Sequence, residues 1–291
     1  MPQNRRSFLI NGSLILLGSQ FVGRANSLLA DEGERILRVA LVTDMHYADK
    51  DPGGTRYYRE TLNKFDEAIS KYAELKPDFL IELGDIVDAA ETVEVELGYL
   101  QTINEKLKQV TDDRHYVLGN HCVYTLTKEE FLGEVGKEES YYSFDRAGWH
   151  FVILDACFRP DGVPYGRKNY KWTETSIPKE ELDWLRDDLQ ATDKPTLVFT
   201  HQRLDVEDHY GVNNSLEVRK VLEGSGKGQA VFQGHSHKNH HVEIGGIHYC
   251  VLAAMIEGSG VENNSYGALD IYRDGTLKLN GFRQQQPYNW S

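Results

Sequence analysis

Short apolar runs alternate along the chain with segments of helical period. The runs at 36–43, 79–83 and 115–118 predict buried strands, because each is short, continuous and followed by polar turn residues. Between them, apolar residues recur every three or four positions over 62–75 and 93–107, which predicts two amphipathic helices. The order strand, helix, strand, helix, strand is typical of a parallel sheet with helical crossovers.

The second half of the chain continues this pattern and then changes. Strands are predicted at 149–154, 196–199 and 230–232, with helices after Pro178 and around 216–222 and a long polar loop at 158–178. From about 240 to 283 the pattern alternates with period two, and Gly245-Gly246 and Asp274-Gly275 are hairpin signals, so we expect a closing antiparallel meander. The predicted fold class is α/β, with two packed mixed β-sheets flanked by helices.

The N-terminal residues 1–30 do not fit the strand and helix pattern. Arg5-Arg6 precedes a weakly apolar run at 8–22 that contains no acidic residue, which is similar to a twin-arginine export signal. We therefore expect the twin-arginine export machinery as a partner and a periplasmic or extracellular location. The alternative is a membrane anchor formed by an uncleaved N-terminus, but a spanning helix needs about 20 predominantly apolar residues. Residues 31–291 contain no linker-like stretch between 36 and 283 and are predicted to form a single domain.

Charge and cysteine content exclude some partners and sites. The formal net charge of −13 argues against non-specific binding to nucleic acid, so no nucleic-acid partner is expected. An anionic substrate would need cationic side chains close to its binding site. The three cysteines, Cys122, Cys157 and Cys250, leave at least one thiol unpaired within the chain and lack the spacing of a zinc site.

Polar residues of one chemical kind follow the predicted strands. Gly84 permits a sharp turn that puts Asp85 at the carboxyl end of a strand, where α/β sheets bind ligands. The strand-end residues that could ligate metal are Asp44, His46, Asp85, Asn120, His201, His235 and His237. Oxygen and imidazole donors in this mixture suit Mn, Fe or Zn, and seven donors suffice for two divalent ions if Asp85 bridges them. Such a pair of ions clamps an in-line phosphoryl displacement and lowers the pKa of bound water.

Five blocks of these residues, spanning 44 to 237, together resemble the signature of calcineurin-like metallophosphoesterases. The blocks are Asp44-x-His46, Gly84-Asp85-x-x-Asp88, Gly119-Asn120-His121, His201 and Gly234-His235-x-His237. The resemblance implies a four-layer αββα sandwich, in which a hydroxide that bridges two metals attacks phosphorus. It also implies that Asp44, His46 and His237 hold the first metal, that Asn120, His201 and His235 hold the second, and that Asp85 bridges them.

The resemblance further implies the catalytic roles of two residues. His121 would contact phosphate without binding metal and would protonate the leaving oxygen, and Asp88 would orient His121. Purple acid phosphatases carry a tyrosine where Asp88 stands, so no purple colour is expected. The family usually has an acidic residue where this chain has Cys122, which is interpreted as an inert small residue, with a redox-sensitive thiol as the alternative.

Cationic and aromatic residues in the loops are candidates for substrate binding. Arg56 and Arg59 follow the first block, Arg203 follows His201, and Trp172 in the long loop is able to stack on a flat group. Each of them could equally be an ordinary solvated loop residue. The segment 246–267 is similar to the manganese-dependent ADP-ribose/CDP-alcohol diphosphatase branch, which favours hydrolysis of a phosphodiester or diphosphate bond in a small anionic substrate. The alternatives are an exported phosphomonoesterase and a metal-binding protein that has lost turnover.

Overall fold

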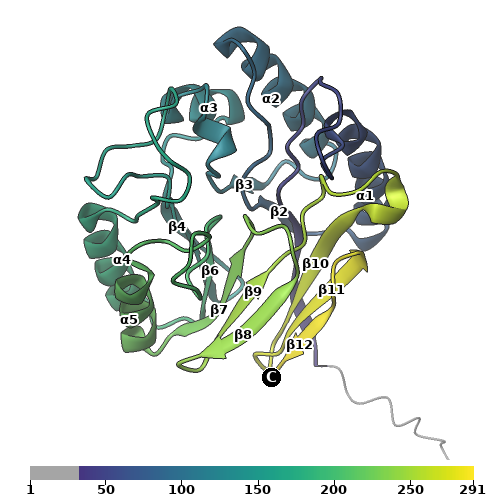
Figure 1. Cartoon of the computed structure of the whole chain (residues 1–291). Coiled ribbons are helices and arrows are strands. Elements are labelled where there is room, and N and C mark those ends of the chain that lie inside the picture. Colours follow the sequence, from purple (N-terminus) through teal and green to yellow (C-terminus); the bar gives the residue numbers. More distant parts are fainter. Residues whose placement is uncertain (1–32) are drawn as a thin grey trace, which may run out of the picture. The chain divides into compact units, whose positions relative to one another are not determined.

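Two six-stranded mixed sheets carry the part of the chain that the computed structural model describes, residues 33–291 (Figure 1). The predicted export signal at 1–30 lies outside the described residues. The first sheet has the order β12-β11-β10-β1-β2-β3. Its strands are β1 (Arg35–Val42), β2 (Phe79–Glu82), β3 (Arg114–Tyr116), β10 (Ser265–Tyr272), β11 (Leu277–Arg283) and β12 (Tyr288–Trp290).

The second sheet has the order β4-β5-β6-β7-β9-β8. Its strands are β4 (Tyr142–Arg146), β5 (Trp149–Ile153), β6 (Thr196–Phe199), β7 (Gly228–Gln233), β8 (His240–Ile244) and β9 (Ile247–Val251). Each sheet contains one set of parallel strands: β1, β2 and β3 in the first, and β5, β6, β7 and β9 in the second. This parallel arrangement brings their carboxyl ends to one edge.

Alternate side chains of the parallel strands face two different hydrophobic layers. In β1, Val39 and Leu41 pack with residues of the second sheet, whereas Ala40 and Val42 pack with the helices α1 (Thr61–Leu75), α2 (Val93–Leu107) and α3 (Lys128–Val135). The second sheet packs α4 (Lys179–Ala191) and α5 (Ser215–Ser225) against its outer face. Figure 1 shows the two groups of helices on opposite sides of the paired sheets. The layers are therefore helix, sheet, sheet, helix, as the sequence predicts.

The C-terminal segment corrects one prediction. Turns fall at Gly245-Gly246 and Asp274-Gly275 as expected, but the segment is not one meander. The hairpin β8–β9 joins the second sheet, where β9 runs parallel to β7, and β10–β12 join the first sheet beside β1. Alternation and turn residues define strands and hairpins but not the sheet edge that a hairpin joins. The sequence analysis also missed α3, although its capping box, Thr127 with Glu130, is a recognisable helix start.

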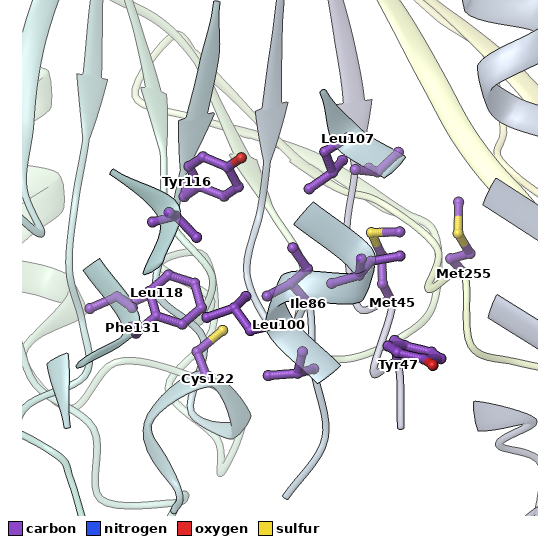
Figure 2. Close-up of a cluster of buried hydrophobic side chains, with 14 of the residues drawn as sticks. Met45, Tyr47, Ile86, Leu100, Leu107, Tyr116, Leu118, Cys122, Phe131 and Met255 are labelled. Carbon is purple, nitrogen blue, oxygen red and sulfur yellow. The ribbon is translucent and has the colours of Figure 1, made fainter. Parts of the chain in front are cut away.

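Cys122 lies in the hydrophobic layer between the first sheet and its helices. Figure 2 shows its sulfur among Leu100, Leu118 and Phe131, and the residue is 0% exposed. Burial raises the pKa of the Cys122 thiol well above its ordinary value. A buried, protonated thiol is chemically inert, which supports the interpretation of Cys122 as a small core residue. Among residues 33–291, no helix is long and apolar enough to cross a bilayer.

Candidate metal centre and active site

The loops after β1, β2, β3, β6 and β7 converge at the carboxyl edge of the two sheets. Backbone hydrogen bonds join them there: Asp44 N donates to Gly84 O at 3.0 Å, His46 N donates to Asp85 O at 2.7 Å, and Gly234 N donates to His201 O at 3.0 Å. Residues far apart in the sequence are thus held within one small volume.

Five of the predicted metal ligands have left-handed backbones. The φ angles are 49° at Asp44, 43° at His46, 57° at Asp85, 69° at His235 and 61° at His237. Such angles are unfavourable for residues with a Cβ and persist only where the surrounding structure enforces them. Because these five positions lie at a single edge, the structure accepts unfavourable backbone conformations there in order to direct the side chains toward one site.

The motif glycines allow the carboxylates to approach the neighbouring backbone. A Cβ on Gly119 would lie 2.2 Å from Asp85 Oδ1, and a Cβ on Gly234 would lie 2.2 Å from Thr43 Oγ1 and 2.6 Å from Asp44 Oδ2. Neither position has room for a side chain. These glycines are therefore required by close packing around the two aspartates.

Two groups of potential ligands share this edge. In the first, His237 Nε2 lies 3.2 Å from both Asp44 Oδ1 and His46 Nε2. The second consists of Asp85, His201 and His235, with His201 Nε2 3.0 Å from Asp85 Oδ2. The same Asp85 oxygen is 3.6 Å from His46 Nε2. Asp85 therefore lies between the groups, where a bridging ligand would have to be.

Unpartnered buried atoms show that the site fits metal ions. Asp44 Oδ1, Asn120 Oδ1 and His235 Nε2 are buried without a hydrogen-bond partner. Buried polar atoms normally have a hydrogen-bond partner, so several buried atoms without partners at one place indicate that a ligand binds there. Carboxylate, amide and imidazole donors match the preferences of Mn, Fe and Zn. All seven predicted ligands lie at this edge, and the assignment of each to one of the two ions stays a prediction.

The histidines are oriented through their Nδ1 atoms. His201 Nδ1 donates to Leu83 O at 2.7 Å, and His237 Nδ1 donates to Glu257 Oε1 at 2.6 Å. Such contacts fix the tautomer and leave Nε2 free for a metal. His46 Nδ1 lies 3.3 Å from Asp88 Oδ2, so its Nε2 faces the site as well.

Crowding of charges shifts the pKa values of the site. Burial alone would lower the pKa of His201 and His237, but the nearby Asp85 and Asp44 carboxylates outweigh it and raise each pKa to about 9. Burial and the neighbouring His201 lower the pKa of His235 to about 3. Burial would raise the pKa of Asp44, but His237 and His201 hold it well below its ordinary value. The carboxylates are thus ionised and ready to bind cations.

His121 and Asp88 form a pair beside the metal ligands. His121 Nδ1 lies 3.3 Å from Asp88 Oδ1, and the backbone N–H of His121 donates to Asp85 Oδ1 at 2.7 Å. Lys50 Nζ is 2.9 Å from Asp88, and a guanidinium nitrogen of Arg56 is 3.6 Å from it. Burial opposes ionisation of Asp88, but the neighbouring His121 and His46 imidazoles hold the pKa of Asp88 below the ordinary range. This arrangement leaves Nε2 of His121 as the ring nitrogen available to a substrate.

A cleft of about 790 Å³ opens above the metal-ligand groups. Of the four residues proposed to bind substrate, Arg56 and Trp172 line it. The ring of Trp172 lies 5.5 Å from that of His235 and 5.9 Å from that of Tyr210. Lys238 lines the cleft as well, so the cleft offers two cationic side chains and an aromatic wall beside the metal-ligand groups.

The other two predicted substrate-binding residues do not line this cleft. Arg59 pairs with Asp49 at 2.5 Å and with Asp51 at 2.7 Å, on the exposed surface. Arg203 forms two hydrogen bonds to Asp205, at 3.0 and 2.6 Å. Both arginines are close to ligand residues in the sequence, but neighbouring carboxylates hold their guanidinium groups away from the cleft.

The contact of Glu257 with His237 and the support of Glu257 by Lys64 were not predicted from the sequence. Glu257 lines the cleft, and the hydrogen bond from His237 lowers the pKa of Glu257 to about 2. Behind it, the buried Lys64 Nζ donates to the carbonyls of Met255, Glu257 and Gly258 at 2.9, 2.8 and 2.7 Å. Lys64 lies on α1 at a helical position that predicts only burial, so no local signal connects it to a loop nearly 200 residues later.

Comparison with known proteins gives consistent matches. The family model of calcineurin-like phosphoesterases matches residues 37–239. A manganese-dependent ADP-ribose/CDP-alcohol diphosphatase from Oryza sativa subsp. japonica is 23% identical over 85% of this chain and 92% of its own, and one from Xenopus laevis is 24% identical over 80% and 85%.

Solved structures agree on the fold. A dimetal phosphatase from Danio rerio superposes with a TM-score of 0.78 at 19% identity, covering 88% of this chain and 99% of its own. A purple acid phosphatase from yellow lupin seeds superposes with a TM-score of 0.56 at 14% identity, covering 88% of this chain and 53% of its own. At these identities the likeness concerns the architecture alone.

Proposed function

This chain belongs to the calcineurin-like phosphoesterase family, and we propose that it cleaves the diphosphate bond of compounds such as ADP-ribose or CDP-alcohols. The curated relatives that match most of its length carry those substrates in their names. Such compounds have an organic group on each phosphate, so their hydrolysis needs an active site that is open on both sides of the reacting phosphorus.

The chain is a hydrolase, a metal-dependent phosphoesterase that uses two divalent ions. The observation that carries this conclusion is the position of Asp85, whose Oδ2 lies 3.0 Å from His201 and 3.6 Å from His46, between two ligand groups. A single carboxylate oxygen within reach of both groups is the arrangement that a dinuclear centre requires.

The residues around this centre support an in-line displacement. When bound, two divalent ions acidify water and neutralise the charge that develops on the phosphoryl oxygens. Asp85 and Asn120 lie where they would hold the ions close to the phosphate. His121, oriented by Asp88 at 3.3 Å, donates a proton from Nε2 to the leaving oxygen. Arg56 contributes the positive charge that a net acidic protein otherwise lacks.

The experiment is hydrolysis of ADP-ribose by manganese-loaded protein, compared with hydrolysis of AMP and with a chelated control. We expect release of AMP and ribose phosphate at a rate well above the rate of phosphate release from AMP. Faster release from AMP would favour the phosphomonoesterase alternative. Absence of turnover of either compound, with both metals present by elemental analysis, would favour a binding protein instead.

We also propose that the twin-arginine machinery exports the chain. The support is Arg5-Arg6 followed by a weakly apolar run without acidic residues. Replacing both arginines with lysine should keep the protein in the cytoplasm of the producing cell, as measured by fractionation. Recovery of the unaltered chain in washed membranes with residues 1–30 intact would support the uncleaved anchor.

A further inference from the structure

The cleft has a second lobe, which is lined by Asn120 but by none of the other six predicted metal ligands. A hollow of about 690 Å³ adjoins the main cleft, and the two share Asn120, His121 and Trp172 as a common wall. We name this hollow the tyrosine lobe, after Tyr124 and Tyr170. Its other lining residues are Asp88, Ala89, Lys171 and Thr173.

Aromatic rings dominate the tyrosine lobe, and they are held in place. Tyr170 stacks on buried Tyr165 with ring centroids 3.7 Å apart, and its hydroxyl donates to the backbone carbonyl of Asn120. Tyr124 lies edge-on to Tyr170 at 6.1 Å and remains 39% exposed. Tyr170 is therefore fixed in place, Tyr124 beside it is accessible, and Trp172 lies between the tyrosine lobe and the main cleft.

The charged groups of the tyrosine lobe are already paired. Lys171 contacts Glu174 at 2.9 Å, and Asp88 is surrounded by His121, His46 and Lys50. The main cleft also has aromatic residues, Trp172 and Tyr210, but it adds the charged Arg56, Lys238 and Glu257. A flat, uncharged group suits the tyrosine lobe, and a hydroxyl-rich polar group suits the main cleft.

Reaction geometry decides which end of the substrate enters the tyrosine lobe. In an in-line displacement the attacking and leaving oxygens lie on opposite sides of phosphorus. Asp85, His235 and His237 line only the main cleft, and Asn120 and His121 line both hollows. Asp88, which lies 3.3 Å from His121, lines only the tyrosine lobe. The group that leaves on the His121 side therefore extends into the tyrosine lobe.

We infer that the tyrosine lobe binds the nucleobase of the substrate, so that the nucleoside monophosphate is the leaving group. This inference rests on the proposed diphosphatase function. Water adds to the phosphorus farther from the base, the bond from that phosphorus to the bridging oxygen breaks, and the bridging oxygen leaves with the nucleoside monophosphate. The bond's electron pair stays on that oxygen, which His121 protonates.

The position of isotopic oxygen tests this assignment. Manganese-loaded protein hydrolyses ADP-ribose in water enriched in ¹⁸O, and mass spectrometry locates the label. We expect the label in ribose phosphate and unlabelled AMP. Label in AMP would overturn the assignment of the base to the tyrosine lobe while leaving the diphosphatase function intact. A lack of ADP-ribose hydrolysis would instead refute the function on which the inference rests.

Substitutions in the lobe supply a second readout. Tyr124→Ala should raise KM for ADP-ribose about 10-fold, because stacking of one base on an aromatic ring is lost. Tyr124→Phe keeps the ring and should restore most of the affinity. Val163→Ala, an equally exposed apolar position in the long loop, is the matched control and should leave KM unchanged. Equal values of KM for the Tyr124→Ala protein and the unaltered protein would contradict the inference.

Discussion

Histidine and carboxylate groups occur both at the amino edge of the second sheet and at the carboxyl edge that the two sheets share, and they differ in how completely their hydrogen bonds are satisfied. At the amino edge, His150 of β5 places its two ring nitrogens 2.8 Å from Asp145 and 2.7 Å from Asp188, and Ser143 donates to Asp188. At the carboxyl edge, His235 Nε2 and Asn120 Oδ1 are buried without partners. The same residue types therefore form a closed structural network at one edge and a receptive site at the other.

Backbone conformation separates the two edges as well. The five left-handed ligand positions all lie at the carboxyl edge, and neither His150 nor its two carboxylate partners has a positive φ. The amino edge also borders a hollow of about 530 Å³. However, His150, Asp145 and Asp188, which line this hollow, form hydrogen bonds with one another. A hollow lined by histidine and aspartate is therefore not sufficient evidence for a metal site. The reactive edge is distinguished by buried ligand atoms without hydrogen-bond partners and by left-handed backbone conformations.

Asp85→Asn should show the largest difference between the edges. Loss of the shared carboxylate removes the negative charge between the two ligand groups, so we expect loss of at least one metal and a fall in activity of about 1,000-fold or more. Asp188→Asn is the matched change at the amino edge and should retain both metals and activity. Elemental analysis with steady-state rates measures both. Full metal content in Asp85→Asn would contradict the bridging role.

His121→Ala should separate metal binding from proton donation. Its ligand atom lies within reach of those of His46 and Asp85, so geometry alone permits a ligand role. We expect the variant to retain both metals while kcat falls about 100- to 1,000-fold, because general-acid catalysis contributes on that scale. Metal loss in proportion to the loss of activity would show that His121 is a ligand.

Glu257→Gln should have a smaller effect on the carboxyl edge. The carboxylate accepts from His237 Nδ1 at 2.6 Å, and loss of such support lowers metal affinity about 10- to 100-fold. Chelator competition measures the change. The control is Glu243→Gln, which should leave metal affinity unchanged. Glu243 lies on the β8–β9 hairpin, and its carboxylate is 4.0 Å from Nδ1 of His248.

His150→Gln should alter only stability, and in a pH-dependent way. The hydrogen bond to Asp188 raises the pKa of His150 above its ordinary value, so the folded state binds the proton more tightly than the unfolded state. The stabilisation is fully present below about pH 6.5 and is lost as pH rises through the folded-state pKa. Urea unfolding of the chain and the variant should differ by on the order of 1 kcal/mol at pH 6 and by less at pH 8.5. A difference that grows with pH would exclude this pair as its cause.

The ligand set was predictable because each block follows a strand whose pattern is plain in the sequence. Parallel strands bring their carboxyl ends together, so Asp44, Asp85 and Asn120, which follow β1, β2 and β3, were expected to meet once the order of strands and helices was recognised. What the sequence did not reveal was pairing between residues remote from any motif. Arg203 donates to Asp205, and Lys64 donates to the loop at 255–258. Both hydrogen bonds depend on tertiary packing.

The position of β1 within the first sheet has a consequence for how the molecule assembles. Within residues 33–291, β1 is the first strand to be synthesised, yet Ala40 pairs with Ala268 on one side and with Leu80 on the other. Contacts of such long range slow folding, because the chain loses the entropy of closing a large loop before it gains the pairing. Until β10 leaves the ribosome, β1, which is followed by the predicted ligand Asp44, has an open edge. Uptake of metal should therefore coincide with the last phase of folding, and refolding followed by metal-sensitive fluorescence would time it.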